Sequence, residues 1–298
     1  MNGVINFLKP PGMSSNHAVG FFKKLLNIKK IGHAGTLDPG ACGVLIILVG
    51  KATKLSDYMM NKGKTYIGEI AFGVSTDTQD AYGAVTQTDD KIVTQTMLED
   101  VLPSFIGEIT QVPSRYSAIK IDGKRAYERA RQGENFEIKA RRVQIEHIEI
   151  LAQTAENRFL LSVKCSKGTY IRALFEDIAK AIGTCAYMSF LERTASGALL
   201  VEDAVTMDEA DARVKCGDIN RFLTPIEEVL ADYPKAVVEK ADFKRVANGL
   251  DGRVASVEKS NSCELYRVYC EGVFFGLGRI TGNRIKITTH LLGENEND

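Results

Sequence analysis

A glycine-rich loop that leads straight into an apolar segment dominates the N-terminal third of this sequence. The loop covers residues 32–43 and holds four glycines, and the next six residues, 44–49, are all apolar and end at Gly50. A short apolar run bounded by glycines is typical of a buried strand. A membrane helix would need about 20 such residues. The sequence therefore predicts a buried strand with a loop at its start, which is a favourable position for a functional site.

Periodicity predicts further strands interleaved with helices. Strands are expected over residues 4–8, 65–74, 117–121, 143–151 and 159–165. Ser14, Ser15 or Asn16 would cap a helix that runs to Leu26, and a basic helix is expected over 124–131. The clearest helix covers residues 171–182, where apolar residues recur at i, i+3, i+4, i+7 and i+8 before a glycine stop signal.

The pattern changes near residues 231–234. Short β-rich runs separated by Asn-Gly, Asp-Gly and Glu-Gly pairs continue to residue 292, with one short helix around 242–247. This pattern indicates a small β-barrel or sandwich. A chain of 298 residues suits about two domains, and we expect them at 1–230 and 231–298, with a frayed tail at 293–298.

Cysteine and histidine usage predicts no metal site. The six cysteines include no Cys-x-x-Cys pair, and the four histidines do not supply zinc-ligand spacing. The N-terminus has no basic segment followed by an apolar stretch of signal-peptide length. We therefore expect reduced, mostly buried thiols in a cytoplasmic protein without a membrane segment.

The formal net charge of zero is the sum of large opposite local charges. Residues 1–64 carry nine lysines against two aspartates, and residues 111–142 carry nine basic against four acidic residues. Charge counts alone favour solvated helix faces. The alternative is a basic groove for a polyanion, because each phosphate contact needs a local cation whatever the global sum.

Common nucleotide and hydrolase motifs do not fit. Gly43 lies seven residues before Gly50, where a P-loop needs five, and Ala52 stands where a magnesium-binding Ser or Thr would be. The loop glycines do not form G-x-G-x-x-G, and neither G-x-S-x-G nor H-E-x-x-H occurs.

An acid in the glycine-rich loop remains as a candidate for chemistry. Asp38 precedes Pro39, and a bare Asp-Pro pair is usually a turn or helix-cap aspartate. The glycines around it permit close approach, which is useful where a flat ligand must come near the backbone. A carboxylate held there could act as a nucleophile or base.

With these residues in view, the sequence resembles the bacterial tRNA pseudouridine-55 synthases. The segment Gly-His-Ala-Gly-Thr-Leu-Asp-Pro (residues 32–39), with residues 43–45 and 50–54, is similar to the signature of that family. Further matching segments follow the family's order: 9–15, 64–66, 76–80, 112–113, 116–120, 166–172 and 191–194. Several separated motifs in one order are far more specific than any one of them, and the resemblance covers about residues 3–230.

The resemblance implies an isomerase that uses neither cofactor nor metal. Asp38 would attack the target uridine, so that the glycosidic bond breaks, the uracil turns and a C–C bond forms. Arg172 would pair with Asp38, since a guanidinium favours the ionised carboxylate and fixes its orientation. Tyr66 would stack on the base and take part in proton removal. Without the resemblance, Arg172 would be read as a helix-surface residue and Tyr66 as a half-buried strand tyrosine.

Five further residues acquire roles by the same resemblance. Tyr170 and Leu191 would line the pocket, and Lys9 and Pro10 would shape it from behind. His33 would wedge into the RNA loop at the place where the uridine leaves the stack. The uridine must leave because its reacting atoms are inaccessible inside the stacked loop. A lone loop histidine is otherwise a surface residue.

The partner implied is tRNA, bound through its T arm with the uridine flipped out, and the two basic blocks would contact phosphates. The C-terminal segment resembles, more weakly, the PUA RNA-binding barrel. Glu192, Ser114-Arg115 and Ala34 depart from the family's usual residues, which affects contacts with RNA more than the chemistry.

The expected fold is α+β, a pseudouridine synthase fold with a mixed, largely antiparallel sheet, packed helices and a small C-terminal β-barrel, and we expect a monomer without protein partners. Two other classes stay open: an RNA-binding or RNA-chaperone protein with a vestigial pocket, and a nucleotide-dependent kinase or GTPase, which the broken Gly-Lys spacing disfavours.

Overall fold

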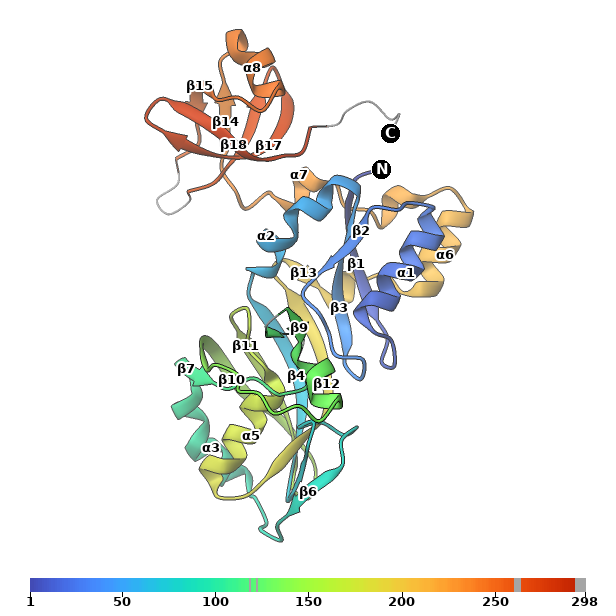
Figure 1. Cartoon of the computed structure of the whole chain (residues 1–298), viewed down its shortest axis with the longest axis vertical. Coiled ribbons are helices and arrows are strands. Elements are labelled where there is room, and N and C mark those ends of the chain that lie inside the picture. The colour runs from blue at the N-terminus through green and yellow to red at the C-terminus, as the bar shows by residue number, and fades with distance from the viewer. Residues whose placement is uncertain (118, 122, 260–263, 293–298) are drawn as a thin grey trace.

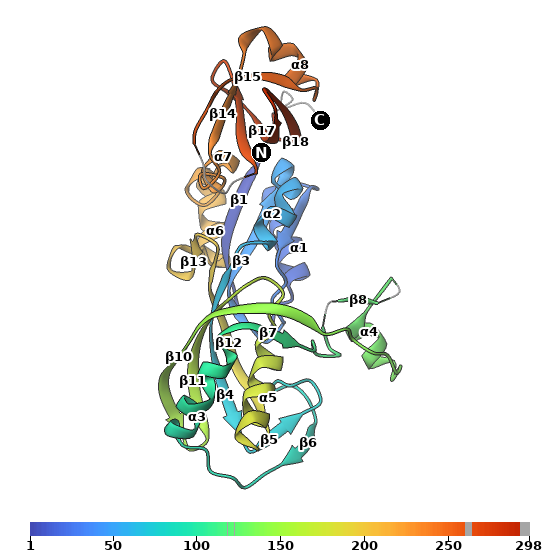
Figure 2. The ribbon, with the colours of Figure 1, turned by 90° about the vertical axis from the view of Figure 1, so that its left-hand side faces the viewer.

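The computed structural model describes residues 1–117, 119–121, 123–259 and 264–292. The molecule is elongated, with a β-barrel at one end and the hairpin of β5 (Val74–Thr76) and β6 (Val85–Thr88) at the other (Figure 1). Between them lies a long sheet that carries helices (Figure 2). Within the described residues, no helix has the length and apolarity needed to cross a membrane.

A nine-stranded sheet forms the body of the molecule. Its main path runs β1-β3-β12-β4-β11-β10-β7, while β2 pairs with β3 and β13 with β12. The strands are β1 (Gly3–Lys9), β2 (Ile31–Ala34), β3 (Cys42–Val49), β4 (Lys64–Phe72), β7 (Gly107–Gln111), β10 (Arg141–Ala155), β11 (Arg158–Cys165), β12 (Ala186–Ser196) and β13 (Leu199–Leu200). Only the β3–β12 pairing is parallel among these strands, so the predicted mixed, largely antiparallel sheet is confirmed.

The apolar run predicted as a buried strand is β3, and both of its faces are covered. Leu45, Ile47 and Val49 point into the main core, together with side chains of the helices. The alternate residues 44, 46 and 48 belong to a second core that includes Leu277 and Leu291 of the barrel. Side chains alternate between the two faces of a strand, so a strand buried on both faces needs an uninterrupted apolar sequence.

Helices pack along the sheet and project from it. They are α1 (Ser15–Leu26), α2 (Ser56–Met60), α3 (Gln95–Val101), α4 (Ala126–Arg131), α5 (Ile171–Ile182), α6 (Met207–Lys215) and α7 (Ile226–Val229). Helix α5 has the predicted bounds, ends at Gly183 in a left-handed conformation and contributes eight buried residues. The Ser14 side chain caps α1 by accepting from the His17 backbone N–H.

The C-terminal region is a closed β-barrel, as one of the two predicted alternatives states. It contains β14 (Lys235–Val238), β15 (Gly252–Val257), β16 (Tyr266–Cys270), β17 (Val273–Thr281) and β18 (Arg284–His290), with the short helix α8 (Phe243–Ala247). Its own core includes Val238, Val268 and Phe275. The predicted tail at 293–298 lies outside the described residues.

The structure corrects several predicted boundaries. The basic helix begins at Ala126 rather than 124, because Lys124–Arg125 form the short strand β9, which pairs with β8 (Lys120–Ile121). The strand expected to reach residue 74 ends at Phe72, because Gly73 takes a left-handed φ of 88°.

The thiols are buried at Cys165, Cys185 and Cys270, while Cys42 is half-buried and Cys216 is exposed. The prediction of mostly buried thiols therefore holds for three of these five, and Cys263 lies outside the described residues.

Candidate active site

The loop that carries Asp38 is fastened on both sides of that residue. Ser15, at the start of α1, accepts from the Leu37 backbone N–H at 3.0 Å and donates to the Leu37 carbonyl at 3.1 Å. On the other side, the Gly12 N–H donates to the Pro39 carbonyl at 2.8 Å. The backbone on either side of Asp38 is therefore held by two separate segments of the chain.

Lys9 supports this loop from behind. Its side chain is fully buried, and Nζ donates to the carbonyl oxygens of Pro10, Met13 and Pro39 at 2.8, 2.7 and 3.3 Å. Burial lowers the pKa of Lys9 to about 8, although nearby Cys42 and Asp38 oppose the shift. Among the residues that line the two cavities described below, neither Lys9 nor Pro10 occurs.

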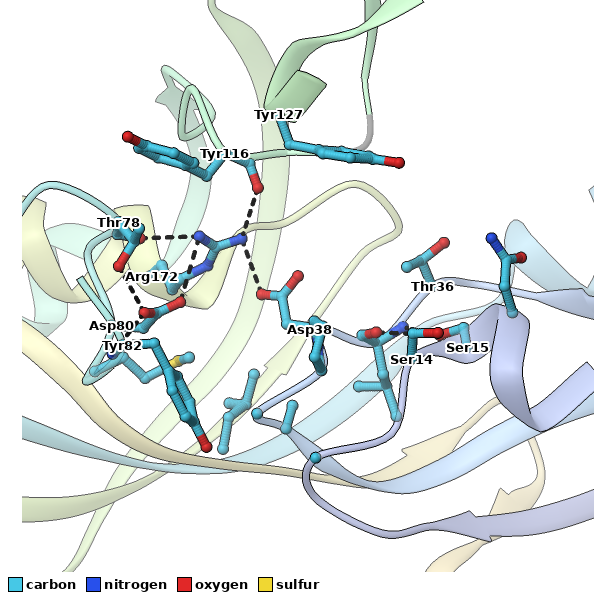
Figure 3. A pocket seen from close by; sticks show the side chains of 18 of the residues that line it. Ser14, Ser15, Thr36, Asp38, Thr78, Asp80, Tyr82, Tyr116, Tyr127 and Arg172 are labelled. Atoms are coloured by element: carbon cyan, nitrogen blue, oxygen red, sulfur yellow. Dashed lines mark hydrogen bonds and ion pairs between the residues drawn. The ribbon is translucent and has the colours of Figure 1, made fainter. Parts of the chain in front are cut away.

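Asp38 and Arg172 form an ion pair, as the resemblance implies. Arg172 Nη2 lies 2.9 Å from Asp38 Oδ2, and the Arg172 side chain is 5% exposed against 38% for Asp38 (Figure 3). A carboxylate facing solvent is therefore held by a buried cation. The alternative of a helix-surface arginine is wrong, because α5 packs this side chain inward.

Three further residues, to which the sequence patterns assigned no role, also hold the Arg172 guanidinium. Arg172 Nη1 donates to the Thr78 carbonyl at 2.9 Å and lies 3.6 Å from Asp80 Oδ2, while Nη2 donates to the Tyr116 carbonyl at 3.4 Å. Figure 3 shows the guanidinium between the two carboxylates. The planar group is fixed at several points, which defines where the Asp38 carboxylate lies.

Three glycines of the loop lie against backbone or side-chain atoms of other parts of the chain. A Cβ on Gly43 would lie 2.3 Å from the Arg193 carbonyl oxygen, and one on Gly40 would lie 2.1 Å from the Tyr82 ring. Gly35 has a φ of 81°, and its nearest neighbour is the Arg193 guanidinium. The close approach at Gly43 and Gly40 is therefore made by protein atoms, while Gly35 and Gly40 also border the cavities described below, so that a flat ligand could still lie against them.

We expect Gly43→Ala to lower the free energy of unfolding by at least about 3 kcal/mol, because a methyl group would press on the backbone of β12 at a φ of 101°. Gly217→Ala is the matched control, since Gly217 has a φ of 73° but, in the part of the chain that the structure describes, nothing lies within 4 Å of an added Cβ. Gly217→Ala should lower the free energy of unfolding by about 1 kcal/mol, because only the left-handed backbone conformation is strained there. Urea unfolding measures both, and equal losses would contradict the close contact.

Two cavities meet at the Asp38–Arg172 pair. Their volumes are about 680 Å³ and about 770 Å³, within the usual range for ligand sites. Both are lined by Thr36, Leu37, Asp38, Arg172 and Leu191. The carboxylate of Asp38 can therefore act on a group that enters from either side.

The first, which we call the tyrosine cavity, is bordered by Tyr82, Tyr116 and Tyr127. It also contains His33, which lies half-buried on β2 rather than on a surface loop. Burial, with Arg193 and Arg125 nearby, lowers the pKa of His33. Its Nδ1 atom is buried and has no hydrogen-bond partner among the described residues.

The second, which we call the basic cavity, is bordered by Tyr66 and Tyr170 together with Lys64, Lys139 and Arg141. Burial raises the pKa of both tyrosines. The Arg141 guanidinium lies over the Tyr170 ring, 5.4 Å from its centroid. The structure thus brings Asp38, Arg172, Tyr66, Tyr170 and Leu191 around one cavity.

Of the two basic blocks, the second contributes most of the cations around the site, and the first contributes Lys64. Arg125 and Arg131 border the tyrosine cavity, and the segment that carries them projects from the sheet (Figure 2). Five of the nine lysines in residues 1–64 instead bind within the chain: Lys9 and Lys64 to local carbonyls, Lys51 and Lys54 to barrel carbonyls, and Lys62 to Asp232. These five lysines therefore bind other groups of the chain rather than forming the groove for phosphates that the charge count suggested.

Sequence reasoning assigned no role to Asp80 and Arg193. Asp80 belongs to the 76–80 motif, but its contact with Arg172 joins segments 92 residues apart, and the motif alone does not predict it. Arg193 lies two positions after Leu191, which was expected to line the pocket. Residues two apart on a strand point to the same face, so the position of Leu191 could have indicated Arg193.

The fold is similar to that of chains in two solved complexes. The chain has a TM-score of 0.75 with a chain in the crystal structure of a Cbf5-Nop10-Gar1 complex, at 26% identity over 97% of this chain and 84% of that one. An archaeal box H/ACA Nop10-Cbf5 complex gives a TM-score of 0.73 at 23% identity, over 97% and 85% of the two chains, which shows the fold alone.

Sequence comparison assigns the family. The model of the TruB family pseudouridylate synthase N-terminal domain matches residues 23–171, and that of the tRNA pseudouridylate synthase B C-terminal domain matches residues 172–231. Proteins named tRNA pseudouridine synthase B from Caldanaerobacter subterraneus subsp. tengcongensis and Clostridioides difficile are 38% and 40% identical, over 96% and 94% of this chain and 98% and 95% of theirs. The chain belongs to the TruB family of pseudouridylate synthases, and it is an isomerase.

Proposed function

We propose that this protein converts uridine 55 in the T loop of tRNA to pseudouridine, with Asp38 as the nucleophile. The observation that carries the proposal is the Asp38–Arg172 pair, 2.9 Å apart, at the wall shared by two cavities. The name shared by the relatives supports tRNA as the substrate.

The target base would leave the RNA stack and enter the basic cavity. Tyr66, Tyr170 and Leu191 offer apolar and aromatic surface for a uracil ring there, and stacking on aromatic side chains is a common way to hold an unstacked base. His33 and Tyr82, which is 76% exposed, border the tyrosine cavity on the other side of Asp38. That cavity would receive the RNA next to the target.

The chemistry balances as an isomerisation without any added reactant. Asp38 attacks at ribose C1′ or at uracil C6, and the bond between N1 and C1′ breaks. After the uracil turns, C5 bonds to C1′, the bond formed by Asp38 breaks and regenerates the carboxylate, the proton on C5 leaves and N1 gains a proton. Tyr66 is the group we assign to the removal of the C5 proton, because it borders the same cavity as Asp38.

Positive charge around the site would hold the phosphates. Arg125 and Arg131 border one cavity, and Lys139, Arg141 and Arg142 border the other. Such contacts position RNA without reading its sequence. We also propose that residues 231–298 form a PUA-like RNA-binding domain beside a catalytic domain at 1–230, and that one copy of the protein is sufficient.

The test is to incubate the protein with an unmodified tRNA transcript and map pseudouridine along it. The matched control is the same transcript with cytidine at position 55. We expect one pseudouridine per tRNA at position 55 and none in the control transcript. Modification at other positions only would contradict the assigned target, and tRNA binding without any conversion would favour an RNA-binding protein with a vestigial pocket.

A further inference from the structure

Arg193 is a buried cation beside the proposed catalytic residues. It lies on β12, between β3 and β4, and its register partners are Gly43 on β3 and Tyr66 on β4. The residue is 1% exposed, yet its atoms border the basic cavity together with Tyr66 and Asp38. A fully buried arginine in the middle of a sheet therefore lies next to the space assigned to the target base.

The contacts of Arg193 go to the elements that carry the chemistry. Arg193 Nε donates to the Val44 carbonyl at 2.7 Å, and Nη2 donates to the Gly35 carbonyl at 2.9 Å. Gly35 begins the stretch that leads to Asp38. Arg193 also faces Tyr66 across the β12–β4 pairing, and both side chains border the basic cavity.

No carboxylate lies within ion-pair distance of Arg193 in the part of the chain that the structure describes. Burying a cation without a carboxylate partner is costly, and an apolar side chain of similar volume would normally fill such a position better. Packing alone therefore does not explain why an arginine is here.

The groups that face Tyr66 show what the cation does. Cys165 from β11 and Asp38 from the loop both raise the pKa of Tyr66, and burial raises it most. Arg193, at the register position opposite Tyr66 on β12, lowers this pKa and so opposes them. It favours the phenolate, which is the form that can accept a proton from carbon.

We propose that Arg193 is a positioning residue that orients the Tyr66 hydroxyl as proton acceptor and ties it to the loop bearing Asp38. The proposal rests on the proposed function, and it extends that function to a residue that acts through Tyr66. Tyr66 first loses its hydroxyl proton to solvent, and Arg193 stabilises the phenolate. When uracil C5 is bonded to C1′, the C5 proton passes to the phenolate oxygen, the C–H electron pair returns to the ring, and N1 takes up a proton from solvent.

A double-mutant cycle with Arg193→Lys and Tyr66→Phe tests this. We expect Arg193→Lys to lower kcat for pseudouridine formation about tenfold or more with KM for tRNA within about twofold, and to lower it less than about threefold in the Tyr66→Phe background. The rising limb of the kcat–pH profile should also differ between wild type and Arg193→Lys, and that difference should vanish with Tyr66→Phe. A merely structural role predicts equal losses in both backgrounds.

Arg158→Lys is the matched control, because Arg158 also lies against a tyrosine, donating to the Tyr187 hydroxyl, but borders neither cavity; it should keep the wild-type kcat. If Arg193→Lys does not fold, Arg193→Gln replaces it in the cycle with the same outcomes. Additive effects, or an unchanged kcat in Arg193→Lys, would overturn the inference while wild-type activity upholds the proposed function. Absence of pseudouridine with wild type would instead overturn the proposed function.

Discussion

Asp38→Asn is expected to lower the rate of pseudouridine formation by about 10⁴-fold or more, because an amide cannot replace the carboxylate as nucleophile. The substitution keeps the size of the side chain. Arg172 also keeps its contacts with the Thr78 and Tyr116 carbonyls and with Asp80. The fold and the affinity for tRNA should therefore change little. Single-turnover rates with tRNA, filter binding and thermal unfolding measure the three quantities.

Asp203→Asn is the control for this experiment, since Asp203 is exposed and lies outside both cavities. It should retain wild-type rate and binding. Turnover by Asp38→Asn within tenfold of wild type would remove Asp38 from the mechanism, whatever its geometry.

Arg172→Lys is expected to lower the rate by about 10²- to 10³-fold, because loss of the planar contacts of this buried pair costs about 3–4 kcal/mol. Lysine keeps the charge but cannot donate in a plane to Asp38, the Thr78 carbonyl and the Tyr116 carbonyl together. Asp38 would then sample orientations away from the cavity wall. The loss should fall mainly on kcat, with the affinity for tRNA close to that of wild type.

Arg221→Lys is the matched control, because the Arg221 side chain is 75% exposed and pairs only locally with Asp218 among the described carboxylates. It should behave as wild type. An Arg172→Lys variant with wild-type kcat would show that charge alone is sufficient and that the fixed plane of the guanidinium is not required.

Local patterns predicted the parts of the fold that depend on local physics. Helix α5 matched its predicted bounds because one face buries apolar residues at helical spacing and Gly183 stops it. The strand β3 followed from its apolar run. The family resemblance supplied the pairing of Asp38 with Arg172, which the structure contains.

Local sequence patterns could not predict contacts between residues that are far apart in the sequence. The Asp80–Arg172 contact and the register that places Arg193 opposite Tyr66 depend on how distant strands pair. The same limit explains the lysines of residues 1–64. A charge count cannot show that Lys51 and Lys54 donate to carbonyls of the barrel more than 200 residues away.

The most direct test uses tRNA transcripts carrying tritium at C5 of uridine. Isomerisation bonds C5 to ribose, so each conversion releases one C5 hydrogen. The account predicts that wild type releases tritium equivalent to one uridine per tRNA, that a transcript with cytidine at position 55 releases none, and that Asp38→Asn releases none over the same time. Equal release from both transcripts, or release by Asp38→Asn at the wild-type rate, would contradict it.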